Sequence, residues 1–235
     1  MIRPLYYTPI LGYHRIGVST GTHVPTVSAA SFERQLRWLW RWKYQVVDLD
    51  EIVAAHERGG PMPRRTTVIT FDDGYEETCT IAWPLLKKFG FPATVFVTPG
   101  EVGLPGFATW EQVRTMANSG MTIGSHTMHH SYLPLVPAEQ LPEELAGSKT
   151  VIEERIQRPI SFLSYPVGGF TPEAKRLAQE AGYRAACTTN RAVSISMDRF
   201  ALRRIKMTDR DAHPLPLRVK LSGYYDMFRR LKRPS

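Results

Sequence analysis

Two adjacent carboxylates, Asp72 and Asp73, are the first side chains in this sequence whose type and position suggest chemistry. They follow the apolar and β-branched run 67–71 and come directly before Gly74. Because neighbouring side chains on a strand point to opposite faces, both can serve one site only where the strand has ended. Gly74 permits a turn at that point. The pair is therefore a candidate functional site, and an acidic Asp-Gly turn without function is the alternative interpretation.

A histidine cluster is the second candidate. Three of the chain's seven histidines, His126, His129 and His130, lie within five residues, directly after the short apolar strand predicted at 121–123. Imidazole is the commonest nitrogen ligand of zinc-like metals, and a carboxylate often completes a set of three. His126 and His130 are four residues apart, so one helical turn or a tight loop places both rings on one side. The alternative is a polar loop that happens to be rich in histidine.

The elements that must position these groups alternate between strand and helix. Strands are predicted at 9–13, 44–49, 67–71, 93–98, 121–123, 160–165, 184–189 and 201–207. Helices are predicted after a Ser31 cap and at 50–58, 76–89, 109–118, 137–157 and 172–181. This alternation favours an α/β fold with a parallel sheet, open or closed. The aspartate pair and the histidine cluster each follow a strand, as do His14 and the stretch 165–166, on the face where α/β barrels form active sites.

Composition and charge limit the function classes. The chain has 235 residues, 43% of them hydrophobic and 22% charged, as expected for one soluble domain with a large core. Its formal net charge of +8 suits a nucleic acid, an anionic membrane surface or an acidic glycan. No nucleic-acid-binding motif accompanies the charge, so we expect no nucleic acid partner. The first residues lack the apolar core of a signal peptide, and we expect a cytoplasmic location.

The two motifs together resemble one known family. TFDDG at 70–74, followed some fifty residues later by GSHTMHH at 124–130, resembles the NodB-type polysaccharide deacetylases, carbohydrate esterase family four. The resemblance covers residues 9–207, and we treat 1–235 as a single polysaccharide deacetylase domain. It implies a distorted (β/α) barrel of about seven strands. It also implies a divalent metal, usually zinc with nickel or cobalt as alternatives, and removal of acetyl groups from N-acetylated sugars of a polysaccharide or glycan precursor.

The resemblance gives each motif residue a role. Asp73, His126 and His130 would bind the metal, and Asp72 would be the general base. The spacing between the two histidine ligands in the family is usually four but can be five, so His129 is ambiguous. We assign His130 as the ligand and expect His129 to support the site or to face outward.

The third family motif, R-x-P-Y-G or Y-P-Y-G, is altered here. Ser164 stands in place of the arginine and Val167 in place of the tyrosine. The resemblance implies that the backbone N–H of Val167 helps to bind the oxyanion, a role that a side-chain change leaves intact. Tyr165 and Pro166 would contact the substrate. A Pro-Gly turn without function is the alternative for these side chains.

The family's usual acid, a histidine in a C-terminal Leu-x-x-His motif, has no counterpart in this sequence. The opening PILGYHRI at 9–16 instead resembles the circularly permuted poly-N-acetylglucosamine deacetylases, whose acid histidine lies there. We therefore assign the acid to His14, with His213 as the alternative. Arg204 would pair with Asp72, and Arg203 is the alternative partner.

The segment 214–235 is basic and its apolar residues recur at helical spacing. One interpretation is a peripheral contact with an anionic inner membrane leaflet. The other is a helix packed on the barrel with a solvated basic face. Two further functions stay open at this point: an amidohydrolase acting on another small amide, and a non-catalytic sugar-binding module that has kept the fold.

Overall fold

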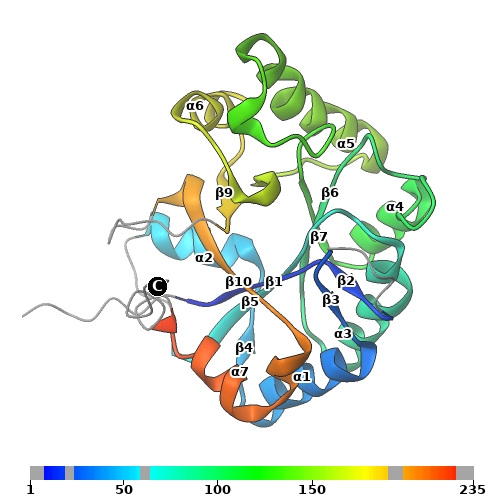
Figure 1. Ribbon diagram of the computed structural model, residues 1–235, viewed down its shortest axis with the longest axis vertical. Coiled ribbons are helices and arrows are strands. Elements are labelled where there is room, and N and C mark those ends of the chain that lie inside the picture. Colours follow the sequence, from blue (N-terminus) through cyan, green and yellow to red (C-terminus); the bar gives the residue numbers. More distant parts are fainter. Residues whose placement is uncertain (1–7, 19–23, 59–63, 190–197, 226–235) are drawn as a thin grey trace, which may run out of the picture.

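The computed structural model describes residues 8–18, 24–58, 64–189 and 198–225 (Figure 1). Parallel strands close into a seven-stranded barrel. Its members are β1 (Ile10–Tyr13), β5 (Thr66–Phe71), β6 (Thr94–Val97), β7 (Thr122–Ser125), β8 (Phe162–Ser164), β9 (Ala185–Thr188) and β10 (Leu202–Lys206). The N-terminal strand β1 completes the ring, because it pairs with β10 on one side and with β5 on the other. The predicted barrel of about seven strands is confirmed.

Three short strands lie outside this ring. β4 (Gln45–Val46) pairs with the start of β5 and is shorter than the predicted strand 44–49. β2 (Arg15–Ile16) and β3 (Thr26–Val27) form a separate parallel pair directly after β1. The chain therefore leaves the barrel at His14 and turns at the rim before the first helix begins.

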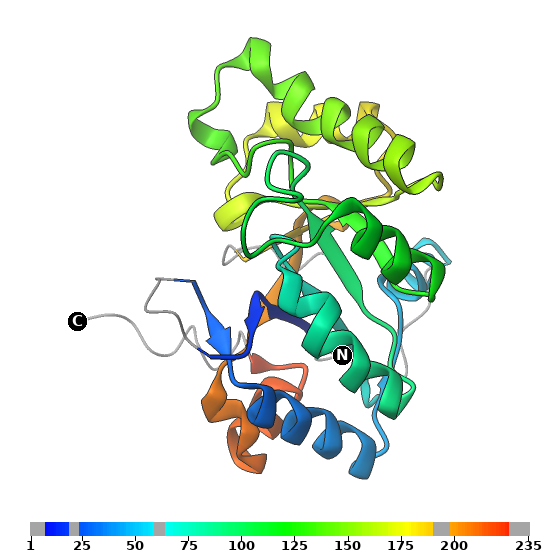
Figure 2. The same ribbon diagram turned by 90° about the vertical axis from the view of Figure 1, so that its right-hand side faces the viewer.

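Helices cover the outside of the barrel, and α1, α3, α4 and α5 lie in a row along one side (Figure 2). The helices are α1 (Ala29–Arg41), α2 (Leu49–Glu57), α3 (Trp83–Phe89), α4 (Trp110–Asn118), α5 (Ser148–Ile156), α6 (Pro172–Glu180) and α7 (Pro214–Lys220). Thr109 and Thr171 cap α4 and α6 through their side chains. Ser28 caps α1 and accepts a hydrogen bond from the N–H of Ser31, so the predicted cap at Ser31 is wrong by one turn.

Two predicted helices are interrupted by wider π-helical turns. Thr78–Ala82 precedes α3, and Glu143–Gly147 precedes α5. Pro84 then falls in the first turn of α3, where its missing N–H is tolerated. The long helix predicted at 137–157 is therefore shorter, and 3₁₀ turns at Leu133–Leu135 and Ala138–Gln140 precede it. Such turns keep the local helical pattern of the sequence while changing the direction of the chain.

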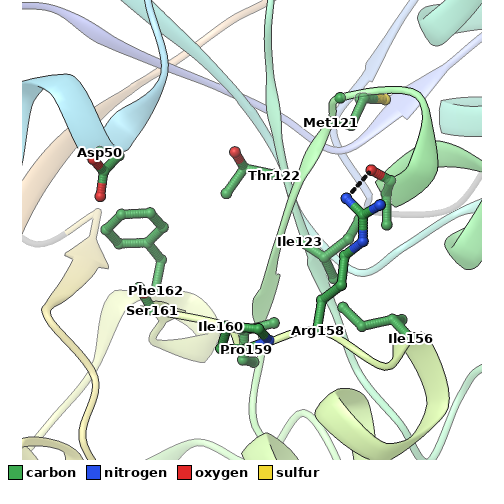
Figure 3. A pocket seen from close by; sticks show the side chains of 12 residues that line it. Asp50, Met121, Thr122, Ile123, Ile156, Arg158, Pro159, Ile160, Ser161 and Phe162 are labelled. Carbon is green, nitrogen blue, oxygen red and sulfur yellow. Dashed lines mark hydrogen bonds between the residues drawn. The ribbon is translucent and has the colours of Figure 1, made fainter.

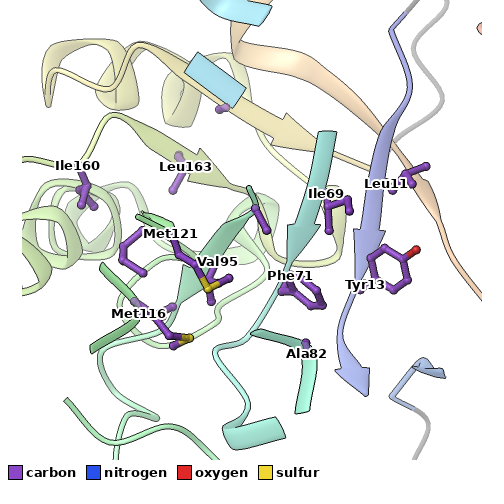
Figure 4. Close-up of a cluster of buried hydrophobic side chains, with 14 of the residues drawn as sticks. Leu11, Tyr13, Ile69, Phe71, Ala82, Val95, Met116, Met121, Ile160 and Leu163 are labelled. Carbon is purple, nitrogen blue, oxygen red and sulfur yellow. The ribbon is translucent and has the colours of Figure 1, made fainter. Parts of the chain in front are cut away.

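The apolar side chains form two separate cores. The larger one lies between the strands and the outer helices and includes Leu11, Ile69 and Val95 (Figure 4). The smaller one fills the barrel interior, where Phe96 and Phe162 meet α2. Gly124 belongs to this interior, because a Cβ there would lie 2.6 Å from the Phe96 ring. The interior is therefore packed tightly below the carboxyl ends of the strands, which leaves those ends as the open face.

Helix α7 packs against the barrel. Leu217 and Leu221 are buried in the larger core, and Tyr44 donates a hydrogen bond to the carbonyl of Leu221. Leu215 and Val219 remain exposed. Helical spacing in this part of the segment thus has a packing role, while membrane contact stays a prediction and residues 226–235 lie outside the described ranges. Within those ranges, no helix combines the length and apolar character needed to cross a membrane.

A pocket at the opposite end of the barrel lies beside the starts of β7 and β8 (Figure 3). Thr122, Ser161 and Phe162 line it, and Arg158 at its edge donates a hydrogen bond to the carbonyl of Ala117. Amino ends of the strands form this face, so the pocket is separate from the candidate site described next.

Candidate active site

Three side chains that could ligate a metal converge at the carboxyl ends of β5 and β7. Asp73, His126 and His130 each offer one ligand atom, and these atoms lie within 4.8 Å of one another. The Asp73 Oδ1 atom is 3.4 Å from Nε2 of His126 and 3.3 Å from Nε2 of His130. The structure therefore brings together the three residues that the two sequence motifs predicted as ligands.

The surroundings of this triad leave its donor atoms available to a cation. The Nδ1 atom of His126 lies 2.7 Å from the carbonyl oxygen of Ser164, so an N–H there donates to that carbonyl and leaves Nε2 free to ligate. Asp73 Oδ1 is buried and has no hydrogen-bond partner among the described residues. Burial alone would raise the pKa of Asp73, but the neighbouring histidines outweigh it and hold the pKa far below its usual range. Two imidazoles and an ionised carboxylate fit a zinc-like cation.

Left-handed backbone forms the loops of the site. Asp73, Thr127, His130 and Val167 have φ values of 70°, 66°, 57° and 55°, and they are four of the seven non-glycine residues with positive φ in the described ranges. Each such residue costs about 1 kcal/mol or more. At Asp73 this conformation turns the chain immediately after β5, so that two consecutive aspartates face the same site.

Glu144 holds the loop that carries His130. Its Oε2 accepts hydrogen bonds from the N–H groups of Met128 and His129, at 3.0 and 3.1 Å. Its Oε1 accepts from Ser131 and lies 3.0 Å from Nδ1 of His129. Burial tends to raise the pKa of Glu144, but these hydrogen bonds outweigh it and lower the pKa. His129 therefore faces away from the triad, whereas Glu144 is a supporting residue that sequence reasoning missed.

Asp72 is paired with Arg204 inside the barrel. The guanidinium donates to both carboxylate oxygens, at 2.6 and 2.5 Å, and also to Thr70 Oγ1 and Ser164 Oγ. Burial would raise the pKa of Asp72, but Arg204 more than compensates and keeps it below the usual range. Arg204, not Arg203, thus makes the predicted pair. Ser164, at the position of the family arginine, accepts a hydrogen bond from Arg204 of β10.

His14 lies beside this pair. Its Nε2 atom is 3.9 Å from Asp72 Oδ2, because β1 and β5 run in register up to Tyr13 and Phe71. Burial lowers the pKa of His14 and outweighs the opposite effect of Asp72. The alternative acid, His213, is exposed and accepts a hydrogen bond from the N–H of Leu215 at the start of α7. Only His14 of the two candidates adjoins the aspartate pair.

In the loop after β8, a backbone N–H is available to the site, whereas the side chains predicted to contact the substrate are buried. Val167 is 72% exposed, and no acceptor within the described residues bonds its N–H. Thr188 and Thr189 donate hydrogen bonds to the carbonyls of Gly168 and Val167 and so hold the loop.

The two side chains predicted to contact the substrate lie below this loop. Tyr165 and Pro166 are both buried, and the Tyr165 ring stacks on Phe170 with its centroid 4.5 Å away. Burial leaves neither side chain a surface for the substrate, so the structure gives them a packing role instead.

Comparisons with known proteins identify the family of this chain. The family model for polysaccharide deacetylase matches residues 59–186. YxkH of Bacillus subtilis, a protein assigned to the polysaccharide deacetylases, is 32% identical over 201 residues, which cover 85% of this chain and 71% of the relative. The poly-beta-1,6-N-acetyl-D-glucosamine N-deacetylase of Staphylococcus aureus MRSA252 is 25% identical over 199 residues, 78% of this chain and 68% of the relative. The Escherichia coli K12 enzyme of that name is 33% identical over 123 residues, only 18% of its length.

Solved structures share the fold. The Streptococcus pyogenes deacetylase PplD, solved in complex with acetate, superposes with a TM-score of 0.84 at 24% identity, covering 91% of this chain and 97% of that one. IcaB from Ammonifex degensii gives a TM-score of 0.77 at 25% identity, covering 88% and 94%. The family match and the Bacillus subtilis relative establish the classification. The chain belongs to the polysaccharide deacetylase family.

Proposed function

We propose that this protein is a metal-dependent hydrolase that removes acetyl groups from N-acetylated sugars of a polysaccharide or glycan precursor. The observation that supports this most directly is the convergence of Asp73, His126 and His130 beside the ion pair of Asp72 with Arg204. Family membership supports the reaction class, and the poly-N-acetylglucosamine deacetylases among the relatives support the sugar. Zinc is the proposed cation, with nickel or cobalt as alternatives.

Asp73, His126 and His130 would hold the cation, which when bound polarises a carbonyl and acidifies water. Asp72 would accept the proton of the attacking water. Each of its oxygens receives one hydrogen bond from Arg204 and keeps further lone-pair capacity for that proton. The pair also keeps Asp72 ionised, which is the state that a base requires.

The remaining steps involve Val167 and His14. Water adds to the acetyl carbonyl, and the N–H of Val167 would donate to the oxygen as negative charge develops there. The C–N bond then breaks, and acetate leaves with the oxygen of the water. His14 would supply the proton that the departing amine needs, from the side of the site where it adjoins Asp72.

A chelation and reconstitution experiment tests the proposal. We expect the purified protein to release acetate from oligomers of N-acetylglucosamine, to stop after metal removal and to recover on addition of zinc. Stoichiometric metal without acetate release from a panel of N-acetylated glycans would contradict it. Activity confined to small amides would favour an amidohydrolase, and absence of bound metal would favour a sugar-binding module.

A further inference from the structure

Three exposed apolar side chains lie in the loops that follow β7 and β8. Tyr132, Leu135 and Val167 are 43%, 82% and 72% exposed, respectively. Tyr132 is two residues beyond the proposed ligand His130. Single exposed apolar residues are common on protein surfaces and need no explanation by themselves. The packing of Tyr132 and the backbone of Val167 distinguish these two from such residues.

The Tyr132 ring lies flush on the backbone of Gly169. A Cβ built at Gly169 would be only 2.1 Å from Cε2 of Tyr132 and 2.7 Å from its Cζ, so no other residue leaves room for the ring. Leu133, next in the chain, is buried and anchors the segment. Tyr132 thus connects the loop that carries His130 with the loop that carries Val167, and its position is fixed before any ligand arrives.

Val167 holds an unfavourable backbone conformation while its side chain remains exposed. A β-branched residue at a φ of 55° is an outlier, and glycine would adopt this conformation with less strain. The backbone N–H would be the same with glycine, so oxyanion binding does not require valine. The side chain is 72% exposed, so it is accessible to a ligand outside the chain.

We propose that Tyr132 and Val167 form an apolar wall against which a pyranose ring of the glycan stacks. This rests on the proposed function and adds the binding surface for the sugar chain. One face of a pyranose ring presents C–H groups while its hydroxyls point outward. An aromatic ring covers such a face and leaves the hydroxyls in water. A ring already fixed by Gly169 loses little conformational freedom on binding, so more of the contact energy appears as affinity.

Kinetics of two Tyr132 variants test the wall on two substrates, a pentamer of N-acetylglucosamine and the small ester 4-nitrophenyl acetate. Tyr132→Ala should raise KM for the pentamer by roughly tenfold, the scale of one aromatic contact. It should leave kcat on the pentamer and hydrolysis of the ester within about twofold, because the proposed catalytic groups are unchanged. Tyr132→Phe should behave like the wild type, since the ring face makes the contact.

Gly169→Ala is a second, independent test. Gly169 has φ −82° and ψ 135°, which alanine adopts freely, so the substitution acts through displacement of the Tyr132 ring. We expect it to raise KM for the pentamer, and Tyr132→Ala to add little in that background. Trp40→Ala is the matched control, because Trp40 is 61% exposed on α1 and should leave both substrates unaffected.

The outcomes distinguish a failure of the proposed wall from a failure of the proposed function. An unchanged KM for the pentamer in Tyr132→Ala would overturn the wall, as would an equal loss on the ester and the pentamer. If the wild type releases no acetate from the pentamer or from any other glycan of the panel, the proposed function fails instead. Calorimetric binding of the pentamer then tests the wall, and equal affinity of the wild type and Tyr132→Ala would reject it.

Discussion

Arg204 binds both carboxylate oxygens of Asp72 in a parallel pair of hydrogen bonds, and both side chains are buried inside the closed barrel. A buried ion pair of this kind need not add to the net stability of the fold. Removal of one partner, however, leaves the other charge buried and unpaired, which is strongly destabilising. The pair therefore ties the folding of the barrel to the ionisation of the proposed base.

Removal of the Arg204 charge should destabilise the protein strongly. We expect Arg204→Met to lower the free energy of unfolding by about 3–5 kcal/mol, because Asp72 would remain as an uncompensated buried charge. The double variant Asp72→Asn with Arg204→Met should recover a large part of that loss. Urea denaturation of the two variants and the wild type measures the difference. Equal loss in the single and double variants would show that packing of the arginine, not its charge, matters.

Metal binding should depend on the triad alone. We expect most of the bound metal to be lost in each of Asp73→Ala, His126→Ala and His130→Ala, as measured by elemental mass spectrometry. Each variant should also lose all acetate release. His129→Ala is the control and should keep its metal, because that ring faces Glu144. Asp72→Asn should keep metal and lose activity. Metal loss in Asp72→Asn together with retention in Asp73→Asn would reverse the two roles.

Turnover should depend on His14. We expect His14→Ala to fold, to bind metal and to lose roughly a hundredfold or more in kcat, the usual scale for general acid catalysis. His213→Ala should change little, since that residue is exposed at the start of α7. Near-normal activity in the His14 variant would reject His14 as the acid.

Acid should destabilise the protein through Glu144. Because hydrogen bonds hold its pKa below the ordinary value, its ionised form stabilises the fold above the ordinary carboxyl range. That contribution is lost as pH falls through the depressed pKa. Glu144→Gln should therefore melt below the wild type near pH 7 and show a smaller decrease in Tm on acidification. Glu139→Gln, at an exposed site, is the control. Parallel Tm profiles of the wild type and Glu144→Gln would contradict this prediction.

Alternating strands and helices predicted a parallel α/β sheet, and the family resemblance added that the sheet closes into a barrel. Apolar runs end at polar motifs, and the carboxyl ends of parallel strands meet at one rim, so the positions of Asp73 and His126 follow from local patterns. The helices α4 and α6 also follow from local pattern and begin where the sequence predicts. Strand and helix lengths were less predictable, because hydrogen bonding to neighbouring strands and π turns decide where each element ends.

Contacts between distant segments were beyond prediction from local pattern. Glu144 is an acidic residue in a helical stretch and gives no sign that it caps a loop fourteen residues earlier. The burial of Tyr165 and Pro166 depends on how Phe170 packs, which no spacing rule contains. Likewise, the packing of the Tyr132 ring on Gly169 joins loops that follow two different strands. The family resemblance did predict two such contacts, the meeting of Asp73 with His126 and His130 and the ion pair of Arg204 with Asp72.

The left-handed backbone at Asp73 and His130 lowers the thermal stability of the protein at two positions that the proposed chemistry needs. Glycine at either position would relax the chain and remove a proposed ligand, so a metal-free variant such as His130→Gly should resist unfolding better than the metal-free wild type. A selection scheme that rewards folding alone would therefore favour inactive proteins. Engineering of this scaffold for hot conditions needs a screen for acetate release at every round. Val167→Gly would relieve strain and keep the proposed oxyanion donor, but it would remove one side of the proposed wall.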